Sequence, residues 1–224
     1  MANSSTASEA MAAAIRVVTI DDSETVVAGI VKAADGSIEH VEWCPTAAGG
    51  AAVAIIKRPD VATINLGGIG NAWRAIREIH DETSGEVPVL IVTGGYQLAY
   101  ADLALEAGAS GIATKAGTAG EIVAAIQRVA EGAEYWDHPW SDRITAIRTG
   151  QPRSAKLLTD LEVDIVTGVV KGAERGEIAD RLGVTKRTVQ RHLSELRDRV
   201  AATNDMAMVT ELLKRGVIDV SALM

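Results

Sequence analysis

Hydrophobic residues in the first part of the chain fall into short continuous runs, separated by longer segments with helical periodicity. The apolar runs are IRVVTI, SIEHVEW, VATINL, VPVLIVT and SGIAT, and NAWRAIREIH is an example of the helical pattern between them. Strands that are apolar throughout are typical of a parallel sheet covered by helices on both faces. The pattern therefore predicts five βα units that form a doubly wound α/β domain over residues 15–134.

The next segment, residues 135–156, has weaker periodicity, and Pro139 and Pro152 would interrupt a long helix there. We interpret it as a linker. It nevertheless contains Trp136 and Trp140, in a chain that has four Trp, three Tyr and no Phe. Because free linkers rarely contain tryptophan, we expect part of this segment to pack on a domain surface.

Residues 157–224 have a purely helical pattern, which predicts a second domain of four helices. Thr159 and Glu162 have the spacing of a capping box, Gly183 can end a short second helix, and Thr185 can begin a third. The apolar positions of the third helix follow i, i+4, i+7 and i+11, at Val189, Leu193, Leu196 and Val200. A fourth helix is predicted from about Asn204 to Gly216.

Net charge differs between the two parts of this 224-residue chain. The total is −8; the first 156 residues hold 12 Lys and Arg against 19 Asp and Glu, and the rest holds 10 against 11. Within the third helix of the second domain, five basic side chains outnumber two acidic ones: Lys186, Arg187, Arg191, Arg197 and Arg199 against Glu195 and Asp198. A basic helix face of this kind favours contact with nucleic-acid phosphates.

Composition narrows the class of protein further. Cys44 is the single cysteine, so no internal disulfide can form, and no Cys or His cluster has metal-ligand spacing. No export signal and no apolar run of eighteen residues is present, so we expect a cytoplasmic protein without a membrane partner. Residues 1–14 are small and polar and are expected to form a flexible tail.

Two helices joined by the turn LGVT, the second with a basic outer face, describe a helix-turn-helix. The string LTDLEVDIVTGVVKGAERGEIADRLGVTKRTVQRHLSELRDRV resembles the DNA-binding domain of the LuxR/NarL/FixJ family over its whole length. The resemblance implies binding to double-stranded DNA. It places Gln190, Arg191 and Ser194 in the major groove and Lys186, Arg187 and Thr188 near phosphate. Gln190 stands where the family commonly has lysine, and Arg175 and Gly176 replace its usual asparagine and lysine, so the target sequence should differ.

Polar residues at the ends of four predicted strands form a second candidate site, because the carboxyl ends of parallel strands share one edge of a sheet. They are Asp21, Asp22, Asn65, Thr93 and Lys115. This set resembles the flavodoxin-like receiver domain of response regulators. In that family the two acids hold Mg²⁺, an aspartate of the third strand accepts a phosphoryl group, and the threonine and lysine bind that group.

Asn65 occupies the position of the phosphoacceptor. A neutral amide cannot supply the carboxylate oxygen that forms an acyl phosphate, so we expect no aspartyl phosphorylation. One negative charge fewer leaves at best a weak Mg²⁺ site at Asp21 and Asp22, and no other cofactor is expected. With Lys115, these acids are either a structural ion pair or a retained ion site. Ile112 replaces an aromatic residue that often reports phosphorylation, and the glycines at 67, 68 and 70 suit a turn rather than a dinucleotide fingerprint.

The sequence thus predicts an atypical response regulator of the LuxR/NarL/FixJ family, a non-enzymatic transcription regulator that binds DNA as a homodimer. Its effector, a small molecule or a protein, is not identified by the residues. Met208, Val209 and Leu212 of the fourth helix either form a dimer contact or fill the monomer core. Two other functions remain open: a phosphotransfer protein with an unconventional acceptor, and a protein-interaction module that does not bind DNA.

Overall fold

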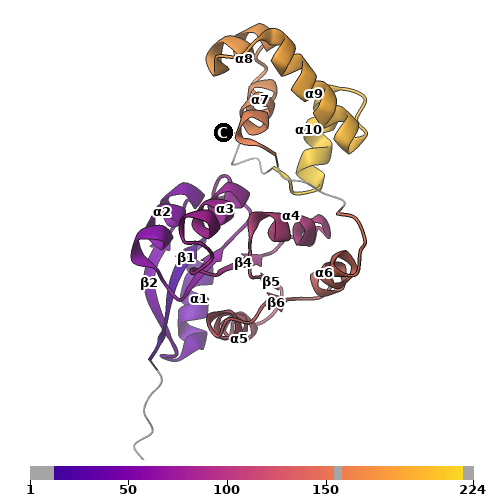
Figure 1. The fold of residues 1–224 in the computed structure, drawn as a ribbon. Helices are drawn as coiled ribbons and strands as arrows, with labels where there is room; N and C mark the ends of the chain where they lie inside the picture. Colours follow the sequence, from indigo (N-terminus) through magenta and orange to yellow (C-terminus); the bar gives the residue numbers. More distant parts are fainter. Residues whose placement is uncertain (1–12, 154–157, 219–224) are drawn as a thin grey trace, which may run out of the picture.

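The computed structural model describes residues 13–153 and 158–218, which form an α/β domain and a helical domain (Figure 1). Most of the segment predicted as a flexible tail, residues 1–12, lies outside the described residues. No helix in the described ranges is long and apolar enough to cross a membrane.

The α/β domain is built on one parallel sheet with the strand order β2-β1-β3-β4-β5-β6. The strands are β1 (Ile15–Ile20), β2 (Ile38–Cys44), β3 (Val61–Ile64), β4 (Val89–Thr93), β5 (Gly111–Thr114) and β6 (Tyr135–Trp136). Every residue of β3 and β4 is buried, which explains why these strands are continuous apolar runs. The five predicted βα units are confirmed, and their carboxyl ends meet at one edge of the sheet.

Helices cover both faces of this sheet, as the pattern predicted (Figure 1). One face carries α1 (Glu24–Ala34) and α5 (Ala119–Ala130), and the other carries α2 (Ala47–Lys57), α3 (Ala72–Glu82) and α4 (Ala99–Ala107). Two separate hydrophobic clusters, one on each face, form the core of the domain, and the cluster under α2, α3 and α4 continues into the helical domain. The domain is therefore doubly wound.

The segment predicted as a linker contributes β6 and a helix, α6 (Trp140–Arg148), to the α/β domain. β6 pairs with β5, and α6 packs on α4. Trp140 is fully buried, and its Nε1 donates a hydrogen bond to the Gln97 carbonyl at 3.0 Å. Arg143 forms an ion pair of 2.8 Å with the fully buried Asp102. The expected packing of a tryptophan is therefore observed, and the α/β domain continues beyond residue 134.

The helical domain consists of α7 (Asp160–Val170), α8 (Arg175–Leu182), α9 (Lys186–Val200) and α10 (Asp205–Lys214). The expected caps are present: Thr159 and Glu162 form a capping box, Gly183 ends α8 in the left-handed conformation, and the Thr185 side chain caps α9. Local sequence therefore sets the start or end of three of these helices.

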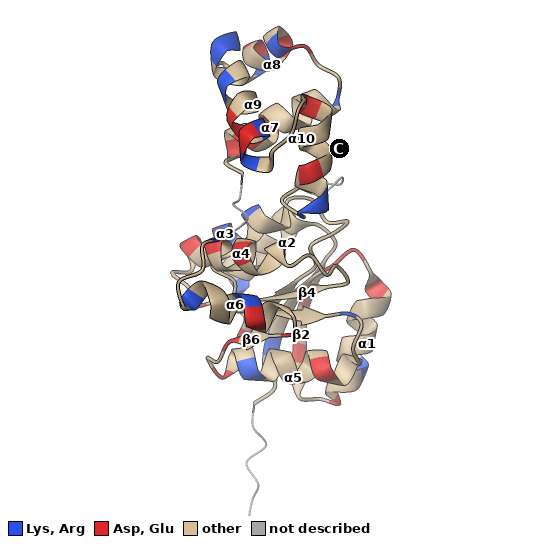
Figure 2. Cartoon of the chain, turned by 90° about the vertical axis from the view of Figure 1, so that its right-hand side faces the viewer, with Lys and Arg blue, Asp and Glu red and all other residues tan. Residues whose placement is uncertain are grey.

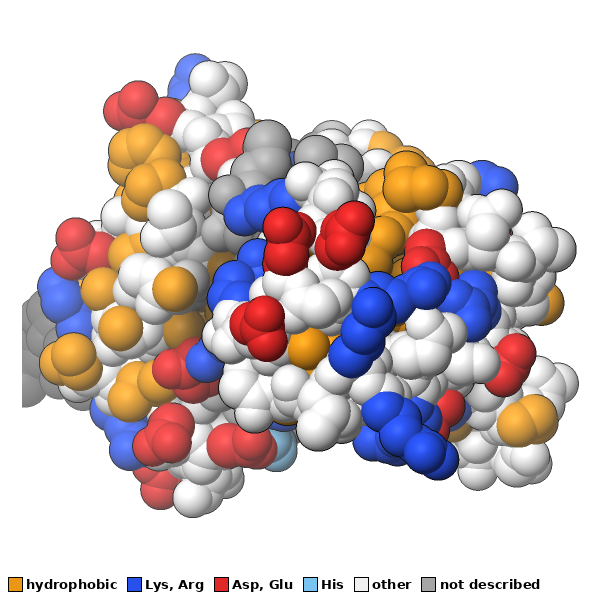
Figure 3. Space-filling model, turned by 90° about the horizontal axis from the view of Figure 1, so that it is seen from above, with side chains coloured by type: hydrophobic (Ala, Val, Ile, Leu, Met, Phe, Trp, Pro, Cys, Tyr) orange, Lys and Arg blue, Asp and Glu red, His pale blue; other side chains and the backbone are white. Residues whose placement is uncertain are grey.

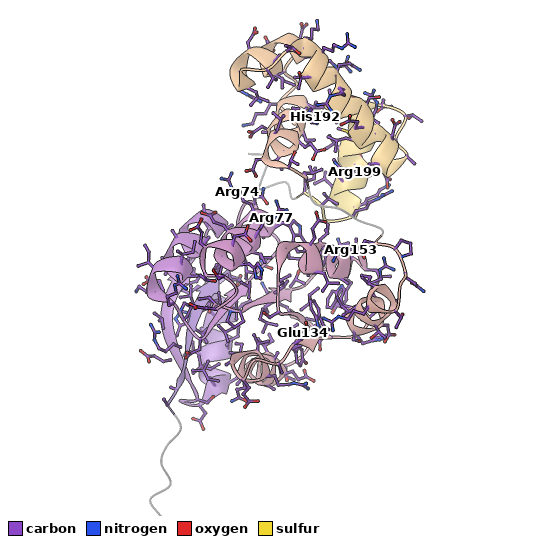
Figure 4. The ribbon with its side chains drawn as sticks, in the orientation of Figure 1. Arg74, Arg77, Glu134, Arg153, His192 and Arg199 are labelled. Carbon is purple, nitrogen blue, oxygen red and sulfur yellow. The ribbon has the colours of Figure 1, made fainter. Side chains whose placement is uncertain are left out.

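The two domains contact each other through α3 and α4 on one side and the ends of α7 and α10 on the other. Trp73 Nε1 donates a hydrogen bond to the Gly216 carbonyl at 2.8 Å, and Arg74 lies 4.0 Å from Asp160. A series of ring contacts leads from Trp73 through Tyr100 to Trp140 of α6. The ring of Tyr96 also stacks on Trp140. Arg74 and Arg77 lie on the side of α3 that faces the helical domain (Figure 4). Helix α8 and the start of α9 are remote from this contact (Figure 1).

Candidate functional site

Helix α9 presents its two faces to different surroundings. Its apolar stripe is buried against α7, α8 and α10, with Val189, Leu193 and Leu196 fully buried. Thr185 Oγ1 accepts a hydrogen bond of 3.1 Å from the Thr188 amide, which fixes the first turn. The opposite face of α9 is polar and faces outward, at the end of the helical domain remote from the α/β domain (Figure 2).

The structure brings most of the predicted DNA-contacting residues together on this outer face. Lys186, Arg187, Gln190 and Arg191 are exposed, whereas Thr188 and Ser194 are half-buried at its margins. The Thr188 hydroxyl lies 2.9 Å from the Thr185 hydroxyl, so the capping turn already uses it. Figure 3 shows basic side chains gathered on this end of the molecule with acidic side chains beside them.

Ion pairing distinguishes several basic residues of the helical domain from the two at the start of α9. Arg175 and Arg197 both bind Asp205, and Arg199 binds Glu162 at 2.8 Å. Figure 4 shows Arg199 on α9, on the part nearer the α/β domain. Within the described ranges, Lys186 and Arg187 form no ion pair, so their charges are available to a ligand. We define these two residues as the free cation pair.

Arg191 also has two contacts with residues of its own helix. Its Nη1 donates to Glu195 Oε1 at 3.1 Å, and its Nη2 lies 3.2 Å from His192 Nε2. The sequence could have predicted the contact with Glu195 from the i,i+4 spacing on a predicted helix, because residues with this spacing are neighbours on a helix surface.

The strand-end pocket is the second candidate site, and the structure brings all five of its predicted residues to the carboxyl edge of the sheet. Lys115 Nζ lies 2.7 Å from Asp21 Oδ2, and the Asp21 and Lys115 side chains are only 3% and 19% exposed. This short contact makes Asp21 and Lys115 a largely buried ion pair. The contact is the ion pair of the first alternative that the sequence left open, and retained ion binding stays a prediction.

Asn65 binds the second acid of the pocket. Its Nδ2 donates to Asp22 Oδ1 at 3.2 Å and to the Gly67 carbonyl at 2.7 Å. Gly68 has a φ of +78°, and a Cβ atom there would lie 2.1 Å from Asp22 Oδ2. The absence of a side chain at Gly68 therefore lets the loop after β3 close over Asp22. This positive φ agrees with the interpretation of the loop glycines as turn residues.

Thr93 is the fifth residue of the strand-end pocket, and its side chain makes a contact within the fold. Thr93 Oγ1 accepts a hydrogen bond of 3.1 Å from the Gly95 amide, and its side chain is buried. Thr93 therefore stabilises the turn after β4. Ile112 is fully buried within β5.

The resemblance to receivers implies a Mg²⁺ ion in this pocket, but the observed donor set does not fit one. A hard divalent cation needs several free oxygen ligands, preferably carboxylates. Here Asp21 is paired with Lys115, and Asp22 accepts from the amide nitrogen of Asn65. Among the described residues, no group of three or more His, Cys, Asp or Glu side chains is placed to hold a metal ion.

The apolar residues of α10 that might have formed a dimer contact lie inside the helical domain. Met208, Val209 and Leu212 are 0%, 5% and 1% exposed. They fill the monomer core, so the alternative in which these side chains bind a second copy does not apply.

Comparison with known proteins agrees with both domains. Residues 156–212 match the family model of bacterial regulatory proteins of the luxR family. The chain is 30% identical to the methanol utilization control regulatory protein MoxX of Paracoccus denitrificans over 163 residues, which are 71% of each protein. It is 27% identical to the transcriptional regulatory protein MctR of Rhizobium johnstonii, covering 91% of this chain and 95% of MctR.

Among solved structures, the fold is similar to RcsB from Salmonella enterica serovar Typhimurium bound to promoter rprA, with a TM-score of 0.61 and 17% identity. That alignment covers 89% of this chain and 98% of RcsB, so it includes both domains. At this identity it supports the fold alone. Together with the family match and the relative at 30% identity, the two-domain architecture leads to one conclusion: the chain belongs to the LuxR family of response regulators.

Proposed function

We propose that this protein is a sequence-specific DNA-binding transcription regulator that works as a homodimer and independently of aspartyl phosphorylation. One observation carries the proposal: the outer face of α9 is exposed and polar, and it holds the free cation pair, Lys186 and Arg187. The relative MctR is named a transcriptional regulatory protein, and the RcsB structure contains promoter DNA, which supports the same function here.

The chemistry of α9 suits a DNA groove. Lys186 and Arg187 stand in the first turn, where the positive end of the helix dipole adds to their attraction for phosphate. Gln190 and Arg191 follow one turn later, and their side chains are types that donate to adenine and guanine edges in the major groove. The cations at the start of the helix would contact the phosphate backbone of the DNA, and the side chains of the next turn would contact the bases.

Salt-dependent binding of the full chain to duplex DNA tests this function. Changing Lys186 and Arg187 to alanine together should reduce the slope of log affinity against log salt by about 1.8, the value for two lost phosphate contacts. A control that changes Lys32 and Arg128 to alanine removes the same charge from α1 and α5 and should leave the slope unchanged. Wild-type protein that binds no duplex at low salt would refute the proposal.

Independence from phosphorylation rests on Asn65 and on the internal pairing of both acids. Acetyl phosphate with Mg²⁺ should add no mass to the protein and should not change its DNA affinity. A stable phosphoryl adduct on any residue of the strand-end pocket would contradict this part of the proposal and would favour the phosphotransfer alternative.

The homodimer is proposed because two-fold symmetric regulators match paired half-sites on DNA. Light scattering of the complex with a selected duplex should give two chains per duplex. A complex with one chain at saturating protein concentration would contradict the dimer and leave the DNA-binding function intact.

A further inference from the structure

Arg191 stands out among the exposed side chains of α9 because residues of its own helix hold two of its nitrogens. Glu195 Oε1 accepts from Nη1 at 3.1 Å, and His192 Nε2 lies 3.2 Å from Nη2. The Arg191 and Glu195 side chains are 59% and 53% exposed, whereas the His192 side chain is 16% exposed. The guanidinium is thus fixed on the surface by one exposed and one largely buried partner.

His192 also lies next to Glu195. A guanidinium only donates hydrogen bonds, so Nε2 of His192 is the acceptor in this contact. His192 Nδ1 is buried, has no hydrogen-bond partner among the described residues and lies 3.8 Å from Glu195 Oε2. Glu195 therefore faces both members of the contact, Arg191 and His192.

A guanidinium held in this way keeps its capacity to read a base. It has five N–H donors, of which these two contacts occupy two, so three remain. Guanine presents two acceptors, O6 and N7, in the major groove. An arginine fixed before binding loses less conformational freedom when it meets these acceptors than a mobile one does.

The charge of Glu195 has a second effect on DNA binding. A carboxylate on the basic face repels the phosphate backbone, and that repulsion weakens binding to every sequence alike. Glu195 therefore lowers affinity for random DNA while it prepares Arg191 for the correct base. Only the positioning of Arg191 increases the ratio of specific to random binding, because a repulsion that acts on every sequence alike cancels in that ratio.

We propose that Glu195 is a positioning residue that sets the sequence specificity of α9 by holding Arg191 against a guanine of the target site. The inference rests on the proposed DNA-binding function and adds the chemistry of the target: each half-site contains a G·C pair read by Arg191. An exposed i,i+4 ion pair alone contributes little to folding, so the expected effect lies in specificity rather than stability.

The test compares Glu195→Gln with wild type in the full-length protein. A preferred duplex is first selected from a random pool with wild-type protein, and affinities for it and for random duplex are then measured. Glu195→Gln should lower the specific-to-random ratio about tenfold and raise affinity for random duplex. The matched control is Asp198→Asn, which removes the same charge from an exposed residue of α9 and should leave the ratio unchanged.

A double-mutant cycle with Arg191→Ala then isolates the positioning effect. In the Arg191→Ala background, Glu195→Gln should not lower the ratio further. An equal loss in both backgrounds would mean that Glu195 contacts DNA by itself, and a ratio like that of Asp198→Asn would mean that it positions nothing; either result overturns the inference. If wild-type protein selects no sequence from the pool, the proposed function fails first, so the two failures are distinguishable.

Discussion

The strand-end pocket and the outer face of α9 are both clusters of charged and polar residues, but their charges have different partners. In the pocket, Asp21 is paired with Lys115 at 2.7 Å, and Asp22 accepts from Asn65 at 3.2 Å. On α9, Lys186 and Arg187 are exposed and form no ion pair within the described residues. Charges that are already satisfied inside the protein bind an external ligand only by losing those contacts, whereas exposed unpaired charges bind phosphate directly.

This difference in the partners of the charges suggests different roles for the two regions. The acids at the carboxyl edge of the sheet already have partners inside the protein, Lys115 for Asp21 and Asn65 for Asp22. The basic side chains at the start of α9, by contrast, are exposed and form no ion pair within the described residues. Four changes, arranged from the largest expected effect to the smallest, would break or refine this contrast.

Lys115→Ala should give the largest change in stability. It leaves Asp21, which is 3% exposed, without its partner, and the free energy of unfolding should fall by about 3 kcal/mol. Lys57→Ala breaks an exposed ion pair with Glu42 and should cost less than about 1 kcal/mol. Chemical denaturation measures both. Equal small losses would show that the Asp21 and Lys115 pair is not structural.

Arg191→Ala should weaken binding to a selected duplex by about 1–3 kcal/mol, because a guanine edge loses its donor. Folding should be unaffected, since the side chain is 59% exposed. Affinity for selected and random duplexes, measured by fluorescence anisotropy, separates the roles: equal losses on both would assign Arg191 to the phosphate backbone.

Asn65→Asp should destabilise the pocket by about 1–2 kcal/mol in the absence of divalent cations, because it places a carboxylate where Nδ2 now lies 3.2 Å from Asp22 Oδ1. Mg²⁺ should restore the lost stability in this variant and have little effect on wild type. Thermal unfolding with Mg²⁺ and with chelator provides the measurement. An Mg²⁺-dependent stabilisation of the same size in wild type would contradict the conclusion that the donor set of the strand-end pocket does not fit Mg²⁺.

Thr185→Ala should have the smallest effect. It removes the side-chain cap of α9 and should lower stability by about 1 kcal/mol. Thr118→Ala removes the equivalent cap from α5 in the α/β domain and should cost a similar amount. Only Thr185→Ala should also weaken DNA binding, because it loosens the turn that holds the free cation pair.

Much of the fold was predictable from the sequence because its signals are local. The apolar runs of β3 and β4 and the stripe from Val189 to Val200 specify buried strands and a one-sided helix. β6 was missed because it has two residues, Tyr135 and Trp136, and exists only through its pairing with β5. The sequence signal that this segment packs was the presence of Trp140, because free linkers rarely contain tryptophan.

For the candidate sites, too, the sequence predicted the residues but not their contacts with residues distant in the chain. Asn65 could be aligned with the phosphoacceptor from the sequence, but its hydrogen bond to Asp22 spans 43 positions and needed the fold. Likewise, the basic composition of α9 was visible, yet the pairing of Arg199 with Glu162 on α7 depends on tertiary packing. Sequence therefore indicated both candidate sites, and the structure shows which of their charges are paired inside the protein.

The most direct test of this account is the DNA affinity of the full-length wild-type chain, measured as a function of salt before and after treatment with acetyl phosphate and Mg²⁺. We predict binding that weakens steeply with salt and is identical with and without the phosphodonor. Absence of duplex binding at low salt, or an affinity that changes together with a phosphoryl adduct, would contradict it.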